Sequence, residues 1–210
     1  MNRTSIINYI CQKTRASSYL EIGANDGQNF NLIDCPNKEA VDPGLHTVAT
    51  HYLSSDDFFS ENESIFDVIF VDGLHHRAQV YRDLINSLEA LSPTGVIICH
   101  DVNPPTKIVQ EVPRRSAKGD GWTGDCWKAW AQLRAERPDL TMFTVDADWG
   151  CGIIFYGFQE LINLNVEDLT WENFSRHRTE WLNLTSPSDF KSTFISSYSH
   201  VSATPSHEVS

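Results

Sequence analysis

The chain has 210 residues, of which 40% are hydrophobic, and a chain of this length and composition can bury one substantial core. Its 16 basic and 28 acidic side chains give a formal charge of −12, which argues against nucleic acid or an anionic membrane as a partner. The five scattered cysteines form no CxxC pair and indicate neither a disulfide framework nor a zinc ribbon. With no signal-peptide core and no apolar run of bilayer length, we expect a soluble, cytoplasmic protein. Its oligomeric state, a homo-oligomer included, stays open.

Patterns in the first third of the chain predict a helix and several strands. Residues 5–16 carry apolar side chains at helical spacing, and residues 18–22 indicate a strand that Gly23 ends. The clearest strand covers residues 66–71, where a continuous apolar run is typical of burial on both faces of a sheet. Between these strands we expect a short helix at 29–35, a second strand at 39–42, a third strand at 47–53 and a helical turn at 55–60.

The central part of the chain alternates strand, helix and strand, which is typical of a parallel α/β sheet. Apolar residues recur at helical spacing over residues 76–91, and residues 95–100 form another apolar strand. Later elements are a long loop at 101–121, a helix at 125–137, an antiparallel pair at 140–145 and 152–158, and short helical stretches near Leu161 and Trp171.

The loop after the first strand lies where open α/β sheets bind ligands, at the carboxyl ends of the strands. Its sequence is Glu21-Ile22-Gly23-Ala24-Asn25-Asp26-Gly27, and the spacing of the two glycines matches neither a dinucleotide fingerprint nor a P-loop. A carboxylate of Glu21 or Asp26 suits the ammonium group of an amino-acid-like tail, whose carboxylate backbone N–H groups would bind. Asp42 ends the second strand, the usual place of an acid that binds ribose hydroxyls. The pattern therefore indicates a nucleoside with a cationic, amino-acid-like tail.

Over about residues 19–155 the chain resembles the class I methyltransferases, which use S-adenosylmethionine. The resemblance rests on the ordered motifs Tyr19-Leu-Glu-Ile-Gly-Ala-Asn-Asp-Gly27, Val41-Asp42 and Phe66-Asp-Val-Ile-Phe-Val-Asp72. It implies an α/β, Rossmann-like fold with a mostly parallel seven-stranded sheet and helices on both faces. We expect this domain at residues 1–158, with an N-terminal helix at 1–17, a C-terminal helical extension at 159–191 and a mobile tail at 192–210.

The resemblance also implies which residues contact the cofactor. It places Glu21, Gly23 and Asn25 beside the methionine moiety, Asp42 beside the ribose, and the segment Ser54-Ser55-Asp56 near the adenine. The expected cofactor-binding residues are Glu21, Gly23, Asn25, Asp26, Gly27, Asp42, Ser55 and Asp72.

Two further strand ends carry side chains that bind metals or protons. Asp72-Gly73-Leu74-His75-His76 follows the strand at 66–71, and His100-Asp101 ends the strand at 95–100. These strands are neighbours in a parallel sheet, so Asp72 and Asp101 can meet in one coordination sphere. Carboxylates suit Mg²⁺ or Mn²⁺, and imidazole widens the choice of divalent metal. The predicted metal ligands are Asp72, His100 and Asp101.

This arrangement resembles the metal-dependent small-molecule O-methyltransferases and their sugar-methylating branch. The resemblance implies that His75 is the catalytic base, and His100 is our second choice. His100 stands where an acid is common in that family, so a different mode of metal binding, or none, stays open. The predicted reaction is methylation of a sugar or natural-product hydroxyl, whose pKa a metal lowers and whose proton an imidazole removes. N-methylation and a catechol-like acceptor also stay open.

Aromatic residues gather after the long loop. Trp127 and Trp130 have helical spacing and are expected in the core, whereas Trp122 lies in a Gly-rich stretch that can close over a substrate. The predicted substrate contacts are Trp122, Asp125 and Lys128. The segment Asp148-Trp149-Gly150-Cys151 recurs in the relatives that the chain resembles, and no physical role is assigned to it from the sequence.

Two other functions stay open. The pattern of His75 or His76 with His100-Asp101 is similar to that of an all-helical family of metal-dependent phosphohydrolases, but it would need a helix where residues 96–99 predict a strand. A non-catalytic binding protein on a methyltransferase fold is the second alternative, because a fold does not guarantee activity.

Overall fold

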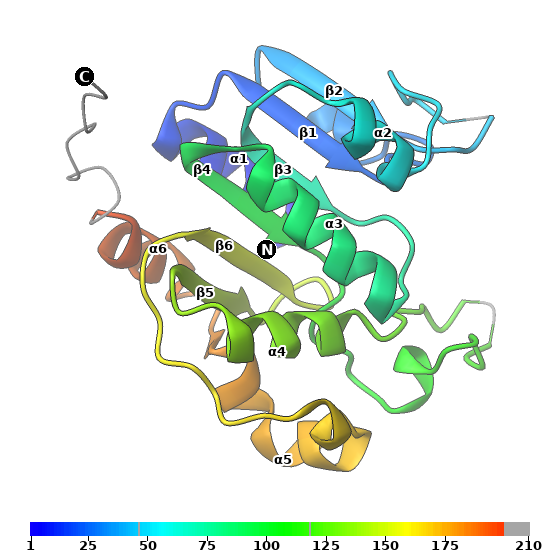
Figure 1. Ribbon diagram of the computed structural model, residues 1–210, viewed down its shortest axis with the longest axis vertical. Helices are drawn as coiled ribbons and strands as arrows, with labels where there is room; N and C mark the ends of the chain where they lie inside the picture. Colours follow the sequence, from blue (N-terminus) through cyan, green and yellow to red (C-terminus); the bar gives the residue numbers. More distant parts are fainter. Residues whose placement is uncertain (46, 118, 200–210) are drawn as a thin grey trace.

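A seven-stranded sheet in the order β2-β1-β3-β4-β6-β5-β7 runs through the protein (Figure 1). The computed structural model describes residues 1–45, 47–117 and 119–199. Within this part of the chain β6 alone runs against its neighbours, which confirms the predicted mostly parallel α/β sheet. The strands are β1 (Ser18–Ile22), β2 (Asn37–Val41), β3 (Phe66–Val71), β4 (Leu91–Cys99), β5 (Leu140–Val145), β6 (Cys151–Tyr156) and β7 (Leu184–Thr185).

Helices cover both faces of the sheet, and the sheet separates two apolar layers of the core (Figure 1). One layer holds α2 (Ser55–Glu61), α3 (Arg77–Glu89), α4 (Cys126–Glu136) and α5 (Trp171–Leu182). The other holds α1 (Arg3–Thr14) and α6 (Phe190–Tyr198), and short 3₁₀ helices lie at Phe30–Leu32, Ile108–Gln110 and Val166–Asp168. In α3 the buried residues Val80, Leu84 and Leu88 recur every four positions, which places one stripe of the helix against the sheet.

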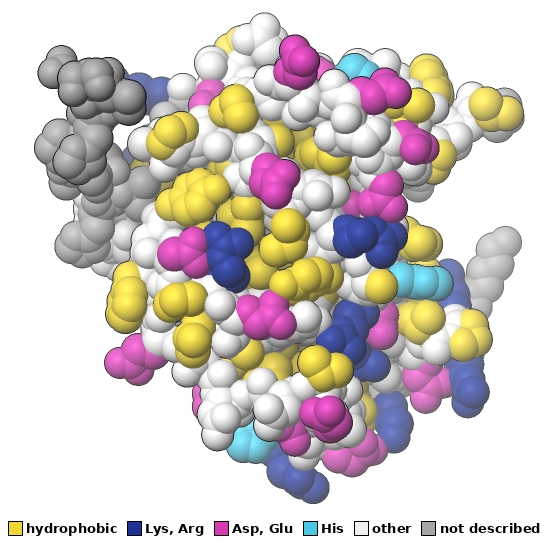
Figure 2. Space-filling view, viewed as in Figure 1, with side chains coloured by type: hydrophobic (Ala, Val, Ile, Leu, Met, Phe, Trp, Pro, Cys, Tyr) yellow, Lys and Arg dark blue, Asp and Glu magenta, His cyan; other side chains and the backbone are white. Residues whose placement is uncertain are grey.

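The surface over α3 and α4 carries acidic, basic and apolar side chains in small groups (Figure 2). No broad basic field is visible on this face, as the formal charge of −12 leads one to expect. None of the helices in the described residues is both long and apolar enough to span a bilayer.

Two predicted elements are wrong. Residues 47–53 form no strand, because in this segment a single isolated bridge, between Val41 and His51, pairs with the edge strand β2. The Thr50 hydroxyl accepts the Ala40 N–H instead, at 2.9 Å, and so ends strand pairing there. Near Leu161 the chain is irregular rather than helical.

The boundary expected for a mobile tail, residue 192, lies inside helix α6. Phe190 and Phe194 are buried, and their rings lie 5.3 and 6.2 Å from that of Tyr9 in α1. These contacts extend the ordered chain through Tyr198, which corrects the prediction for residues 192–198. The rest of the predicted tail, 200–210, lies outside the described residues.

The segment expected as a helical extension contacts the core directly. Its strand β7 pairs with β5, and Trp127 of α4 stacks on Phe174 of α5 with ring centroids 4.3 Å apart. Trp181 of α5 lies 6.2 Å from the same indole. The domain boundary at residue 159 stays a prediction about folding units, and these contacts predict that both parts unfold together.

We expect Trp127→Ala to lower the free energy of unfolding by about 3–5 kcal/mol, because the fully buried indole would leave a cavity between α4 and α5. Urea unfolding followed by circular dichroism measures this. Tyr52→Ala, at a side chain that is 57% exposed, is the control and should change the free energy by less than about 0.5 kcal/mol. A separate, earlier transition of the C-terminal segment in the wild-type protein would contradict the account.

Candidate active site

The register of the parallel strands brings four sequence-predicted residues to one edge of the sheet. Ile22 pairs with both Val41 and Val71, and Val71 pairs with Cys99. The next residue after each strand end therefore emerges in the same row, and the row consists of Gly23, Asp42, Asp72 and His100. Backbone hydrogen bonds from Gly23, Asp72 and His100 to the neighbouring strands, at 2.8–3.0 Å, fix this row in place.

Gly23, here called the glycine floor of the cavity, lies so close to the Asp72 backbone that no side chain fits at this position. A Cβ atom at this position would lie 2.2 Å from the Asp72 carbonyl oxygen, and the backbone has a φ of +89°. Both the close approach and the left-handed conformation require glycine. The loop behind it is tied to β2, because the Asn25 and Gly44 N–H groups both donate to the Asp42 carboxylate, at 2.9 and 2.8 Å.

A cavity of about 730 Å³, here called the main cavity, extends along this edge. Pockets of this size commonly bind small molecules and cofactors. Asp42 and Ser55 lie toward β2 and α2, whereas His75 and Asp101 lie beyond β3 and β4. The lining residues are Arg3, Ile22, Gly23, Asn25, Val41, Asp42, Pro43, Ser54, Ser55, Asp72, Gly73, Leu74, His75, Gln79, His100, Asp101, Gly121, Trp122 and Trp149.

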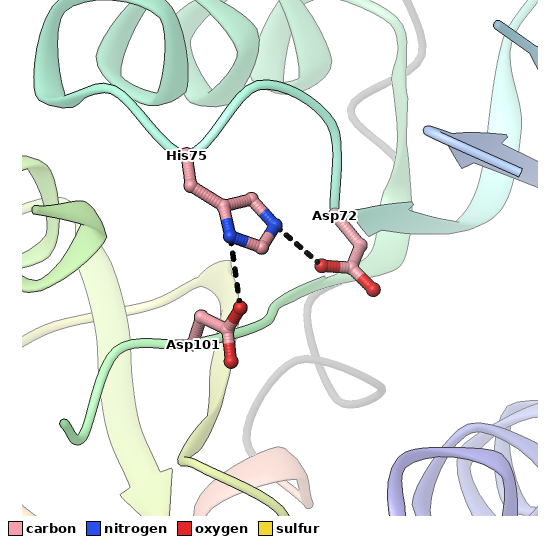
Figure 3. A group of neighbouring side chains, drawn as sticks. All are labelled: Asp72, His75 and Asp101. Atoms are coloured by element: carbon pink, nitrogen blue, oxygen red, sulfur yellow. Dashed lines mark hydrogen bonds and ion pairs between the residues drawn. The ribbon is translucent and has the colours of Figure 1, made fainter. Parts of the chain in front are cut away.

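His75 lies between two carboxylates (Figure 3). Its Nε2 is 3.3 Å from an Asp72 oxygen, and its Nδ1 is 3.1 Å from an Asp101 oxygen and 3.0 Å from the Trp122 carbonyl oxygen. Trp122 also stacks on the imidazole, with centroids 5.4 Å apart. Burial lowers the pKa of His75, but the hydrogen bond to Asp72 and the charges of Asp101 and Asp72 outweigh it, so the pKa is raised.

Asp72 is surrounded by positively charged and imidazole groups. Its second oxygen accepts a hydrogen bond from Arg3 Nη1 at 2.7 Å, and its first lies 3.3 Å from both His75 and His100. Burial alone would raise the pKa of this carboxyl, but the charge and hydrogen bond of His100 and the hydrogen bond of His75 hold it well below the ordinary value. Asp72 therefore remains a carboxylate at neutral pH.

His100 lies beneath this group and is nearly inaccessible. Its Nδ1 is 3.2 Å from an Asp101 oxygen, and its side chain is 2% exposed. Desolvation lowers its pKa, yet the charges of Asp72 and Asp101 raise it well above the usual histidine value. The imidazole thus lies between two carboxylates whose charges favour its protonated form.

The segment that sequence reasoning left without a role joins this group. Asp148 and Trp149 both have left-handed backbone, with φ of 50° and 66°, and such strain is commonly found at functional sites. The turn directs Asp148 onto Arg3, whose backbone N–H and Nε donate to one carboxylate oxygen at 2.8 and 3.1 Å. It also packs the Trp149 ring on Gly121, where a Cβ atom would lie 2.5 Å from the indole.

Glu21 lies beside a second, smaller cavity, here called the side cavity. Its carboxylate accepts hydrogen bonds from the Tyr19 hydroxyl and, at 3.0 Å, from Asn29 Nδ2. Burial raises the pKa of Glu21 to about 7, although both hydrogen bonds lower it. The side cavity is also lined by Arg3, Gly23, Asn25 and Asp72, so it adjoins the main cavity.

The other predicted residues divide into two groups. Asp26 lines the side cavity, and Gly27 shapes the loop beside it with a φ of +81°. Trp122 lines the main cavity, but Asp125 and Lys128 line a separate small cavity of the long loop. Asp125 instead accepts the Arg77 N–H at 2.7 Å at the start of α3, so the structure does not bring the predicted Asp125 and Lys128 contacts to the main cavity.

Sequence reasoning missed Arg3, Asn29, Gln79 and the roles of Asp148 and Trp149. Arg3 reaches Asp72 across 69 positions of the chain, and no local pattern marks a charged residue at the start of a helix as part of a site. The Asp148-Trp149-Gly150 segment was visible as an unusual sequence for a hairpin. Gly150, with a φ of +92°, suits this left-handed turn, whereas Asp148 and Trp149 adopt it at a cost in strain.

Comparison with known proteins shows what the first half of the chain is similar to. Residues 9–102 match a family model described as a methyltransferase domain. The match supports the predicted resemblance to class I methyltransferases, and the sheet has the predicted mostly parallel order. A search of curated proteins found no match.

Solved structures show the same fold at low sequence identity. An O-methyltransferase from Bacillus cereus, in complex with S-adenosylhomocysteine, is 14% identical with a TM-score of 0.55, and the match covers 74% of this chain and 80% of that one. The O-methyltransferase TomG from Streptomyces achromogenes, in complex with S-adenosylmethionine, is 13% identical with a TM-score of 0.53, covering 73% and 79%. The sugar N-methyltransferase KedS8 from a Streptoalloteichus species is 14% identical with a TM-score of 0.52, covering 73% and 86%. The fold therefore serves both oxygen and nitrogen acceptors.

We expect Gly23→Ala to weaken S-adenosylhomocysteine binding by at least about tenfold, because the new methyl group displaces the Asp72 backbone that forms the cavity floor. Isothermal titration calorimetry measures the affinity. Gly119→Ala is the matched control, since it also has a positive φ but no atom within 4 Å of its Cβ position. If both substitutions lowered the affinity equally, the cause would be strain at a positive φ and not the close approach of residue 23 to Asp72.

Proposed function

We propose that the protein transfers a methyl group from S-adenosylmethionine to a hydroxyl oxygen of a small molecule in the main cavity. One observation carries this proposal. A cavity of about 730 Å³ joins a strand-end acid, Asp42, to an imidazole held between two carboxylates, with the glycine floor between them. Asp42 is suited to bind a ribose diol, and the imidazole of His75 is suited to remove a proton from an acceptor.

Residues along the two adjoining cavities would border successive parts of the cofactor, from the adenosine to the methionine. Ser55 and Asp42 would border the adenosine, and the Gly23–Asn25 loop would border the methionine, next to Glu21 in the side cavity. Gly23 lets the loop lie close against Asp72, because any side chain there would meet the backbone of that residue. The complexes of the Bacillus cereus and Streptomyces proteins with this cofactor or its product support the assignment by similarity of fold.

In the proposed reaction the chain positions the acceptor and removes its proton. The methyl group of a sulfonium is already electrophilic, so alignment of the acceptor oxygen in line with it supplies much of the rate enhancement. His75 accepts the hydroxyl proton at Nε2, and the carboxylates of Asp72 and Asp101 stabilise the imidazolium that forms. The Trp122 carbonyl and indole hold the ring in its orientation.

The acceptor end of the main cavity is largely apolar apart from these groups. Leu74, Trp122 and Trp149 line it, and planar indoles suit the apolar faces of sugars and of aromatic natural products. A sugar or natural-product hydroxyl is therefore the proposed acceptor class. We further propose that the protein acts in the cytoplasm without a nucleic-acid or membrane partner.

We expect His75→Ala to lower kcat by about 10²- to 10⁴-fold, the usual contribution of a general base, and to leave the affinity for S-adenosylhomocysteine unchanged. A transfer assay with radiolabelled cofactor over a panel of glycosides and phenols measures this. The control is His76→Ala, which removes the adjacent imidazole without touching either carboxylate. If His75→Ala were as active as the wild type, His75 would not be the base.

A metal-assisted form of the reaction is the second candidate. Asp72, His75 and Asp101 each offer one ligand atom, and these atoms lie within 4.8 Å of one another. Two carboxylate oxygens and one imidazole fit Mg²⁺ or Mn²⁺, which would lower the pKa of an acceptor hydroxyl. The set differs from the predicted one, in which His100 took the place of His75. Arg3 and His100 already offset the charge of Asp72, so we place the metal-free reaction first.

Treatment with EDTA separates the two forms. On the metal-free account, the EDTA-treated protein keeps its full activity, and added Mg²⁺ or Mn²⁺ changes it by less than about twofold, because His75 needs its lone pair for the proton. Activity that is lost with EDTA, returns with Mn²⁺ and fails to return in Asp101→Asn would establish the metal-assisted form instead.

The phosphohydrolase alternative does not fit the fold. It requires a helix at His100-Asp101, whereas these residues follow strand β4 in a parallel sheet. A non-catalytic binding protein stays an alternative, and it predicts that cofactor binds without turnover of any acceptor.

A further inference from the structure

Trp149 lines two cavities, the main cavity and a further one of about 430 Å³, here called the third cavity. The third cavity is lined by residues of the turn after β5, of helix α5 and of the segment 103–105. Its polar lining residues are Asn103, Asp146, Asp148 and Arg178. Because Trp149 belongs to both linings, the cavities adjoin at this residue, and a ligand in the main cavity can extend past it.

Arg178 offers the third cavity a guanidinium without a carboxylate partner. Its Nη1 donates to the side-chain oxygen of Asn103 and, at 2.7 Å, to the Pro104 carbonyl oxygen. Within the described residues its Nε and Nη2 have no hydrogen-bond acceptor, and the guanidinium forms no ion pair. Three of the five N–H donors of this side chain are therefore left for a ligand or for water.

The guanidinium is held in position by two aromatic rings of its own helix. It lies over Phe174 at 4.5 Å and over Trp171 at 5.6 Å from the ring centroids. Burial lowers the pKa of Arg178 and the charge of Asp146 raises it in part, but an arginine stays protonated at neutral pH. Arg178 is thus a half-buried, oriented cation beside a cavity.

Asp146 offers a free acceptor in the lining of the same cavity. Its Oδ1 accepts a hydrogen bond from Asn103 Nδ2 at 2.8 Å, and no donor among the described residues reaches its Oδ2. Asn103 therefore joins the two charged groups, since it accepts from Arg178 and donates to Asp146. The carboxylate of Asp148, by contrast, is already bound by Arg3.

This combination of groups selects the kind of ligand. An anion would meet the carboxylates of Asp146 and Asp148, and a cation would meet Arg178. A neutral ring with several hydroxyl groups avoids both conflicts, because its hydroxyls donate to Asp146 and accept from Arg178. The indole of Trp149 adds an apolar face against which such a ring can pack.

We propose that the third cavity is a second acceptor subsite, which binds a sugar ring attached to the group that is methylated. Arg178 and Asp146 bind the hydroxyls of this ring, and Trp149 lies between it and the main cavity. The inference rests on the proposed function and narrows its acceptor class to glycosides that carry at least two sugar rings.

Pairs of acceptors that differ by one ring test the proposal. The pairs are p-nitrophenyl β-glucoside with p-nitrophenyl β-cellobioside, and p-nitrophenyl α-glucoside with p-nitrophenyl α-maltoside. In the transfer assay with radiolabelled cofactor, we expect the wild-type protein to have an approximately tenfold lower KM for a diglycoside than for its monoglycoside. Arg178→Gln should raise the KM of the diglycoside by about tenfold, with kcat unchanged, and should change the KM of the monoglycoside by less than about twofold.

Two further variants separate recognition from loosening of the structure. Asp146→Asn changes an exposed side chain and keeps an oxygen that accepts from Asn103, so it should fold normally and raise the KM of the diglycoside by about threefold to tenfold. Arg176→Gln is the matched control, because it removes a charge from the same helix at an exposed residue outside the third cavity. It should leave both KM values at those of the wild-type protein.

Equal KM values for the two members of each pair in the wild-type protein would overturn the proposal, as would equal losses for both members in Arg178→Gln. A lower KM of the diglycoside in Asp146→Asn would also overturn it, because that carboxylate would then repel the ligand. If the wild-type protein bound S-adenosylhomocysteine but methylated no acceptor, the proposed function would fail. Saturation-transfer NMR with cellobiose and maltose then tests the third cavity separately: binding that Arg178→Gln removes and Arg176→Gln keeps supports it as a sugar site, and absence of binding overturns it.

Discussion

The carboxylate of Asp72 is the group on which the rest of the site depends. It lies at the end of β3 and is only 15% exposed, and a buried carboxylate is costly unless other charges and hydrogen bonds compensate for its lost hydration. Compensation comes from three places in the chain, namely Arg3 in α1, His75 in the loop before α3 and His100 at the end of β4. The requirement to satisfy this one charge therefore holds three elements together around the cavity.

The same requirement explains the strained turn at Asp148. Left-handed backbone at non-glycine residues costs on the order of 1–3 kcal/mol, and it persists only where surrounding contacts favour it. Here the Asp148 carboxylate accepts hydrogen bonds from both the backbone and the side chain of Arg3. The turn after β5 thus secures the N-terminal helix beside the site, and a single cluster of charges shapes both the main cavity and the side cavity.

The sequence predicts that residues directly after buried parallel strands belong to the site. Apolar runs indicate the strands, and ligands bind at the carboxyl ends of such strands. Gly23, Asp42, Asp72 and His100 are examples, and the register of the sheet places them in one row. Arg3 could not be predicted, since its role depends on how α1 packs on the sheet. Residues 47–53 were predicted as a strand from their composition, whereas the Thr50 side chain ends pairing with β2.

We propose that the row of strand-end residues binds S-adenosylmethionine for methyl transfer. The most direct measurement is a calorimetric titration of the purified protein with S-adenosylhomocysteine, repeated with Asp42→Ala. The account predicts a micromolar dissociation constant for the wild-type protein and loss of detectable binding in the variant. Absence of binding to the wild-type protein, or equal binding to both proteins, would contradict it.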